Sequence, residues 1–169
     1  CIRDRYTDMP EYTAGLNTGF SWKNFDFSMQ WTGAWNVDRM LDEFRRPLGD
    51  TNEKGLLLYQ YDTTWRSSAD TFTAKFPRTS SLHASNNYAG SDLYLINASY
   101  LRLKSVEIGY NFNFPFMKKL KMDNCRLYVN GYNLITITGF KWGDPESRQS
   151  SRPNYPLTRV FNIGLKLGF

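Results

Sequence analysis

Residues 11–35 read EYTAGLNTGFSWKNFDFSMQWTGAW, and this stretch decides the fold. In its first half every second residue is apolar or small, and polar residues and glycines stand between them. The same alternation resumes after Lys23 and Asn24. A period of two is typical of a strand with one apolar and one polar face, and a two-residue break between such runs is typical of a hairpin. We therefore expect antiparallel strands at about 11–22 and 25–37.

The length of these strands indicates a membrane. A strand of about 13 residues tilted by about 45° spans about 30 Å, the thickness of a bilayer core, whereas strands of soluble proteins are about half as long. The apolar face is then expected to meet lipid, with aromatic residues near the strand ends. The residues expected on this face are Tyr12, Leu16, Phe20, Trp22, Phe25, Phe27, Met29, Trp31, Val106, Ile108, Tyr110, Phe161, Ile163, Leu165 and Leu167.

Three more strands are expected at about 99–112, 125–138 and 157–169. In the first of them the alternation inverts near Lys104, so its upper half either extends above the membrane or carries a bulge. In the second, Leu127 and Val129 are expected to point outward, although the pattern weakens beyond residue 130. The sequence thus predicts an all-β chain of five antiparallel strands.

The connections alternate between short and long. About 12 residues join the third and fourth strands, whereas segments 38–98 and 139–156 are longer and polar. Short turns on one side and long loops on the other are typical of outer-membrane barrels, so the long segments are expected to be extracellular. Within them, residues 36–46 change to helical spacing, which predicts a short amphipathic helix.

Several tracts together resemble one family. They are Ser99-Tyr100-Leu101-Arg102-Leu103-Lys104 before Gly109-Tyr110, Phe76-Pro77-Arg78 after Trp65, Leu127-Tyr128-Val129 with Asn133-Leu134, Asp144-Pro145-Glu146, and Tyr155-Pro156 before Arg159. With the hairpin, these tracts make the chain similar to the C-terminal barrel region of SusC/RagA-type TonB-linked outer-membrane transporters of Bacteroidetes.

This resemblance implies the fold, location and partners of a larger protein. The fold would be a plugged transmembrane barrel of about 22 strands, of which this chain supplies the last five. The protein would sit in the bacterial outer membrane and import a glycan or an oligopeptide, driven by TonB. A SusD-like lipoprotein would close its extracellular face, and outer-membrane lipid, the barrel remainder and the plug would be its other neighbours.

Two sets of residues are candidates for specific roles. The ending, with Asn162, Gly164, Leu167 and Phe169, resembles the barrel-assembly signal of outer-membrane proteins. Loop aromatics could stack on sugar rings or pack against a lid, since their faces are apolar and rigid. These candidate contacts are Tyr59, Tyr61, Trp65 and Trp142.

The sequence gives little support for metal binding, redox chemistry or catalysis. Residues 50–55 begin like a calcium loop, but Lys54 stands at a ligand position and Tyr61 replaces the bidentate glutamate. His83 is the single histidine, and two distant cysteines make no metal or redox motif. No serine or paired-carboxylate constellation predicts an enzyme, so neither a cofactor nor a metal nor a catalytic residue is expected.

One alternative reading comes from another class of protein. A soluble carbohydrate-binding β-sandwich would share the 17% aromatic content and the polar loops. It would bury its apolar strand faces against a second sheet. The exposure of those faces therefore separates the two readings.

Overall fold

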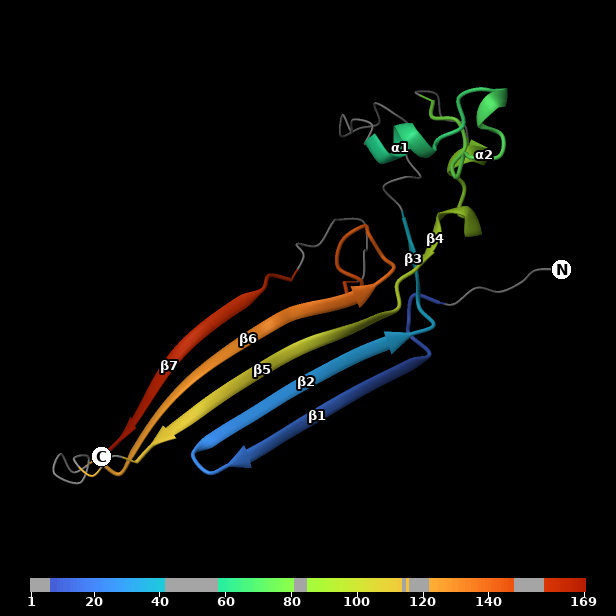
Figure 1. Cartoon of the computed structure of the whole chain (residues 1–169). Helices are drawn as coiled ribbons and strands as arrows, with labels where there is room; N and C mark the ends of the chain where they lie inside the picture. The colour runs from blue at the N-terminus through green and yellow to red at the C-terminus, as the bar shows by residue number, and fades with distance from the viewer. Residues whose placement is uncertain (1–6, 42–57, 81–84, 114, 116–121, 148–156) are drawn as a thin grey trace.

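The main feature of the molecule is a single five-stranded antiparallel sheet (Figure 1). The structure, a computed structural model, describes residues 7–41, 58–80, 85–113, 115, 122–147 and 157–169. The strands are β1 (Tyr12–Trp22), β2 (Phe25–Trp35), β5 (Tyr100–Phe112), β6 (Asn124–Thr138) and β7 (Val160–Gly168). They lie in the order β1-β2-β5-β6-β7. The predicted all-β class with five antiparallel strands is therefore confirmed.

The register across the sheet explains the alternation in the sequence. Residues paired across antiparallel strands point to the same face, so a row of partners shares one environment. One row consists of Phe20, Phe27, Ile108, Val129 and Ile163. The adjacent row consists of Gly19, Ser28, Glu107, Asn130 and Asn162. We call the two sides of the sheet the outward face and the inward face, respectively.

A bulge in β5 causes the inverted alternation. Ser105 pairs with Gln30 and Leu103 with Trp31, so Lys104 is an extra residue with no place in the ladder with β2. The extra residue returns Leu103 to the outward face. Of the two possibilities that the sequence left open, the structure shows the bulge, and extension of the strand above the membrane stays a prediction.

A second irregularity lies opposite, in β6. Ser105 pairs with Tyr132 but Leu103 pairs with Ile135, so two residues of β6 stand opposite one of β5. Asn133, the first of these two, has a left-handed φ of 53°, which asparagine tolerates better than most residues. This break explains why the alternation in the sequence weakens beyond residue 130.

The helix predicted for residues 36–46 is wrong in the part that the structure describes. Instead, β3 (Asp38–Met40) pairs antiparallel with β4 (Leu95–Asn97). The reason is tertiary: residues more than 50 positions away supply hydrogen-bond partners for this backbone, which overrides the local helical spacing. Residues 42–46 lie outside the described residues.

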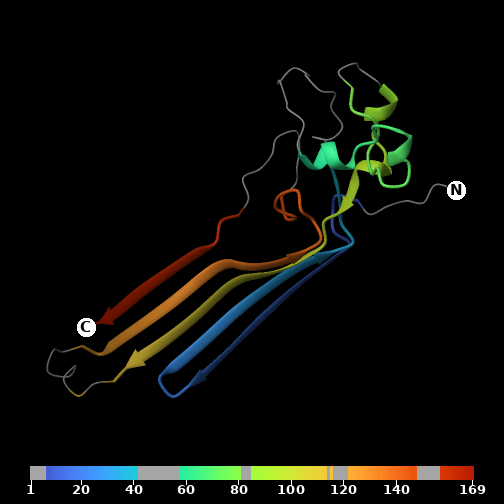
Figure 2. The same ribbon diagram turned by 45° about the horizontal axis from the view of Figure 1, so that its top comes forward.

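The remaining short elements join β3 and β4 in a small body that we call the outcrop, residues 37–41, 58–80 and 85–98. It contains α1 (Leu58–Thr63), η2 (Ser68–Asp70), α2 (Ser85–Tyr88) and η3 (Asp92–Tyr94). Figures 1 and 2 show it beyond one end of the sheet, opposite the β1–β2 turn. None of the helices in the described part of the chain is long and apolar enough to cross a membrane.

The only hydrophobic core cluster found among the described residues belongs to the outcrop, not to the sheet. Its buried members are Val37, Leu41, Phe76, Tyr94, Ala98 and Phe140, and Met40, Tyr59, Ile96 and Trp142 pack against them. Phe140 and Trp142 come from the connection after β6, so this core joins two separate loops. The large sheet lies as a single layer below it (Figure 2).

Candidate functional site

The outward face of the sheet is an uncovered apolar surface. The expected lipid-facing residues Phe20, Trp22, Ile108, Tyr110, Phe161, Ile163 and Leu165 are exposed, and Phe25, Phe27, Met29 and Trp31 are half-buried among their neighbours. Of the further residues expected there, Tyr12, Leu16 and Leu167 are exposed and Val106 is half-buried. In the described part of the chain, no second large sheet covers these residues, as a sandwich would require. Their contact with lipid stays a prediction.

The inward face carries a charged network in the half of the sheet nearer the β1–β2 turn. Arg126 donates hydrogen bonds to both carboxylate oxygens of Asp26 and, from Nη2, to Glu107 Oε1 at 2.7 Å. Asn130 donates to the other oxygen of Glu107 at 3.3 Å and accepts from Asn162 at 2.9 Å. These contacts connect β2, β5, β6 and β7 across the sheet. Because the charged side chains are partly solvent-accessible, this face suits a wet interior.

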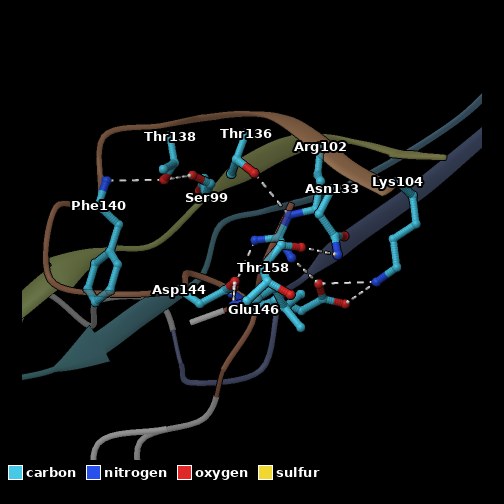
Figure 3. Close-up of polar contacts among 11 residues, drawn as sticks. Ser99, Arg102, Lys104, Asn133, Thr136, Thr138, Phe140, Asp144, Glu146 and Thr158 are labelled. Atoms are coloured by element: carbon cyan, nitrogen blue, oxygen red, sulfur yellow. Dashed lines mark hydrogen bonds and ion pairs between the residues drawn. The ribbon is translucent and has the colours of Figure 1, made fainter. Parts of the chain in front are cut away.

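A second and more deeply buried network lies at the outcrop end of the same face. Its centre is Arg102 of β5, whose side chain is 2% exposed (Figure 3). Nε of Arg102 donates to Thr136 Oγ1 at 3.1 Å, Nη1 to Glu146 Oε2 at 2.7 Å, and Nη2 to Asp144 Oδ1 at 2.8 Å. Lys104, the bulge residue, adds an ion pair to Glu146 at 3.3 Å. Two cations thus face two carboxylates, so the cluster is close to neutral.

The acids of this cluster come from residues 139–147, which we call the clamped loop. Asp144 Oδ1 also accepts from the backbone N–H of Glu146 at 2.9 Å, and Oδ2 accepts from that of Leu157 at 3.4 Å. Burial alone would raise the pKa of Asp144, but the hydrogen bond from Arg102, these N–H groups and the charge of Arg102 hold the pKa below its usual value. Asp144 therefore stays ionised at neutral pH.

Two of the four candidate contact aromatics pack inside the molecule. The ring centroids of Tyr59 and Trp142 are 4.2 Å apart, and those of Tyr59 and Phe76 are 6.2 Å apart. Both Tyr59 and Trp142 pack against the outcrop core. These contacts connect α1 with the loop after β6, and they need no bound ligand.

The other two aromatics are open to solvent. Tyr61 lies under the guanidinium of Arg66, at 4.8 Å from the ring centroid, and Trp65, two residues after α1, is exposed. Both belong to the outcrop, which lies at the end of the sheet away from the β1–β2 turn (Figure 1). Contact with a substrate or a lid stays a prediction for all four.

The residues of the candidate assembly signal take four different positions in or beside β7. Asn162 lies on the inward face and Leu167 on the outward face, opposite Cys125. Gly164 lies beneath the Tyr128 ring, since a Cβ there would be 2.3 Å from Tyr128 Cζ. Phe169 follows the strand and is 83% exposed. Reading of these residues by an assembly machinery stays a prediction.

Sequence patterns did not predict the cluster around Arg102. Its acids lie more than 40 residues from Arg102 and in a loop, where no periodicity places them. Among the described residues, no group of three or more His, Cys, Asp or Glu could hold a metal ion. His83 and residues 50–55 lie outside the described residues.

Comparison with curated proteins finds bacterial receptors. The sequence is 29% identical to TonB-dependent receptor P3 of Formosa agariphila over 95% of this chain, and 28% identical to TonB-dependent receptor SusC of Bacteroides thetaiotaomicron over 92%. The chain spans only 16% and 15% of the lengths of these two receptors. No family model matches the chain.

Comparison with solved structures finds the same fold. The RagAB peptide importer in its "open-open" state matches with a TM-score of 0.73 and 22% identity, over 97% of this chain and 18% of the importer chain. The importer in its "closed-closed" state matches with a TM-score of 0.75 and 21% identity, over 99% and 18%. At these identities the likeness establishes the shared fold.

Proposed function

We propose that this chain, a homologue of the SusC-type TonB-dependent receptors, forms part of the wall of an outer-membrane nutrient importer. The observation that carries the proposal concerns the described residues: they form a single-layer sheet with an uncovered apolar face, a polar face and two edges without a neighbouring strand. In a membrane the apolar face would meet lipid and the polar face a water-filled or plugged lumen. A soluble β-sandwich would bury this apolar face against a second sheet, so that alternative is not favoured.

The edges of the sheet support a larger barrel. Within the described residues, β1 and β7 are each paired on one side only. Unpaired backbone N–H and C=O groups in hydrocarbon cost several kcal/mol each, so a membrane sheet must close on itself. We infer that further strands flank β1 and β7 in a barrel of about 22 strands that encloses a plug.

The connections suggest the orientation. Lys23 and Asn24 form a tight turn at one end of the sheet, and the outcrop and the clamped loop stand at the other. Outer-membrane barrels have short periplasmic turns and long extracellular loops. The outcrop would therefore be extracellular, in a multi-pass outer-membrane protein.

The relatives support a proposal for the transported substance and the partners. One solved relative is named a peptide importer and the SusC relative a TonB-dependent receptor. We propose TonB-driven import of a glycan or an oligopeptide, with a SusD-like lipoprotein as a lid over the outcrop. The relatives are receptors and importers, and we assign no catalytic role to this chain.

Gene deletion tests the proposal. A strain that lacks the full-length protein should lose uptake of one class of nutrient from a panel of labelled glycans and oligopeptides. A strain that lacks TonB should lose the same uptake, because the energy would come through TonB. The plasmid-borne gene should restore it. Unchanged uptake across the whole panel, or recovery of the protein from the soluble fraction, would overturn the proposal.

A further inference from the structure

The clamped loop is held at two places that lie on different parts of the molecule. At its acidic end, Asp144 and Glu146 bind Arg102 on the inward face of the sheet. At its other end, Phe140 is 4% exposed within the outcrop core and Trp142 packs against that core. A short loop that is held on two different parts of a molecule links those two parts. Here it connects the barrel wall to the outcrop.

The hydrogen bonds around the loop ends strengthen this connection. Thr138 Oγ1 donates to the Ser99 carbonyl at 2.8 Å and accepts from the N–H of Phe140 at 3.1 Å (Figure 3). The loop therefore leaves β6 in a fixed direction. From there Trp142 reaches Tyr59 of α1, at 4.2 Å between ring centroids.

We propose that Arg102 is a positioning residue, which sets the place of the outcrop by holding the clamped loop against the wall. Arg102 acts on the outcrop through the loop: its guanidinium fixes Asp144 and Glu146, and the loop then fixes Trp142 against Tyr59. The wall and the outcrop thus move as one unit. Only the extracellular use of that unit rests on the proposed function.

Arginine suits this role better than lysine. Its planar group donates at once to Thr136, Asp144 and Glu146, with donor–acceptor distances of 2.7 to 3.1 Å. A lysine ammonium carries the same charge but has no fork to hold two carboxylates in one plane. Removal of the arginine would also leave Asp144 buried without its cation, which favours release of the loop.

Hydrogen exchange on the full-length protein in detergent tests the proposal without a transport assay. The reporters are the N–H groups of Thr64, Trp65 and Phe76, which donate to outcrop carbonyls at 2.9 to 3.1 Å. In Arg102→Met, their exchange should accelerate by about tenfold as local opening becomes easier. In Arg102→Lys, these amides should exchange at rates between those of the wild type and those of Arg102→Met. Amides of the β1–β2 hairpin should keep their wild-type rates.

Arg126→Met is the matched control. Arg126 also binds two carboxylates, but both belong to strands of the sheet. This variant should leave outcrop exchange unchanged. The proposal is overturned if Arg102→Met accelerates exchange in the clamped loop alone, if Arg126→Met loosens the outcrop equally, or if Arg102→Lys restores full protection.

Two milder variants cover the case in which Arg102→Met does not assemble. Asp144→Asn and Glu146→Gln keep Arg102 and remove one carboxylate charge each. Each should accelerate outcrop exchange, and the double variant should do so more. Wild-type exchange in the double variant would overturn the proposal. An importer with no detectable uptake but with coupled exchange would contradict the proposed function and leave the coupling intact.

Discussion

At the scale of single residues, close contacts on the inward face determine which substitutions the sheet tolerates. Gly164 is the clearest case, because the Tyr128 ring occupies the space where a side chain would begin. Gly139 is its opposite, since no atom lies within 4 Å of a Cβ built there. A side chain at position 164 would therefore clash whereas one at position 139 would not, so Gly139 serves as the control for Gly164.

We predict that Gly164→Ala destabilises the full-length barrel by about 1–3 kcal/mol, the usual cost of overpacking. Gly139→Ala should change the free energy of unfolding by less than about 0.5 kcal/mol. Urea unfolding in detergent, followed by the heat-modifiable gel shift of the barrel, measures both. In a Tyr128→Ala background the cost of Gly164→Ala should fall, because the ring is gone. Equal costs in both backgrounds would refute the contact.

At the scale of elements, the alternation along each strand assigns neighbouring residues to opposite faces of the sheet. In β7, Ile163 is 78% exposed on the outward face, and Asn162 beside it bonds Asn130 on the inward face. A charge should therefore cost much more at position 163 than at the adjacent position 162.

We predict that Ile163→Lys lowers the free energy of unfolding of the full-length protein in lipid vesicles by about 2–4 kcal/mol, the cost of a cation near the bilayer midplane. Asn162→Lys should cost less than about 1 kcal/mol, because a lysine on the wet face keeps its hydration and loses a single exposed hydrogen bond. Similar costs for both variants would mean that the outward face does not meet lipid.

At the scale of the whole molecule, the sheet has neither a second layer nor closed edges within the described residues. Its strands are stabilised by their ladders and by polar clusters at two levels of the inward face, around Arg126 and around Arg102. The buried apolar core lies in the outcrop. Such a sheet depends on neighbouring strands for most of its protection from solvent.

We predict that residues 1–169 expressed alone in detergent do not form a protected monomer. The amides of β1 and β7 should exchange within seconds to minutes, whereas in the full-length protein they should be protected for hours by strands on both sides. Size-exclusion chromatography with hydrogen-exchange mass spectrometry measures both states. A monodisperse fragment with protected β1 and β7 would show that these residues are a self-contained domain.

The sequence by itself determined the strands and their faces. Apolar and polar side chains alternate at every second position, so the pattern from Tyr12 to Trp35 records the two faces of the sheet directly. Only the tertiary structure decided the bulge at Lys104, the β3–β4 pair in place of a helix, and the cluster around Arg102. Each depends on partners distant in the chain, as with Arg102 and Asp144, which are 42 residues apart. Local periodicity carries no information about such partners.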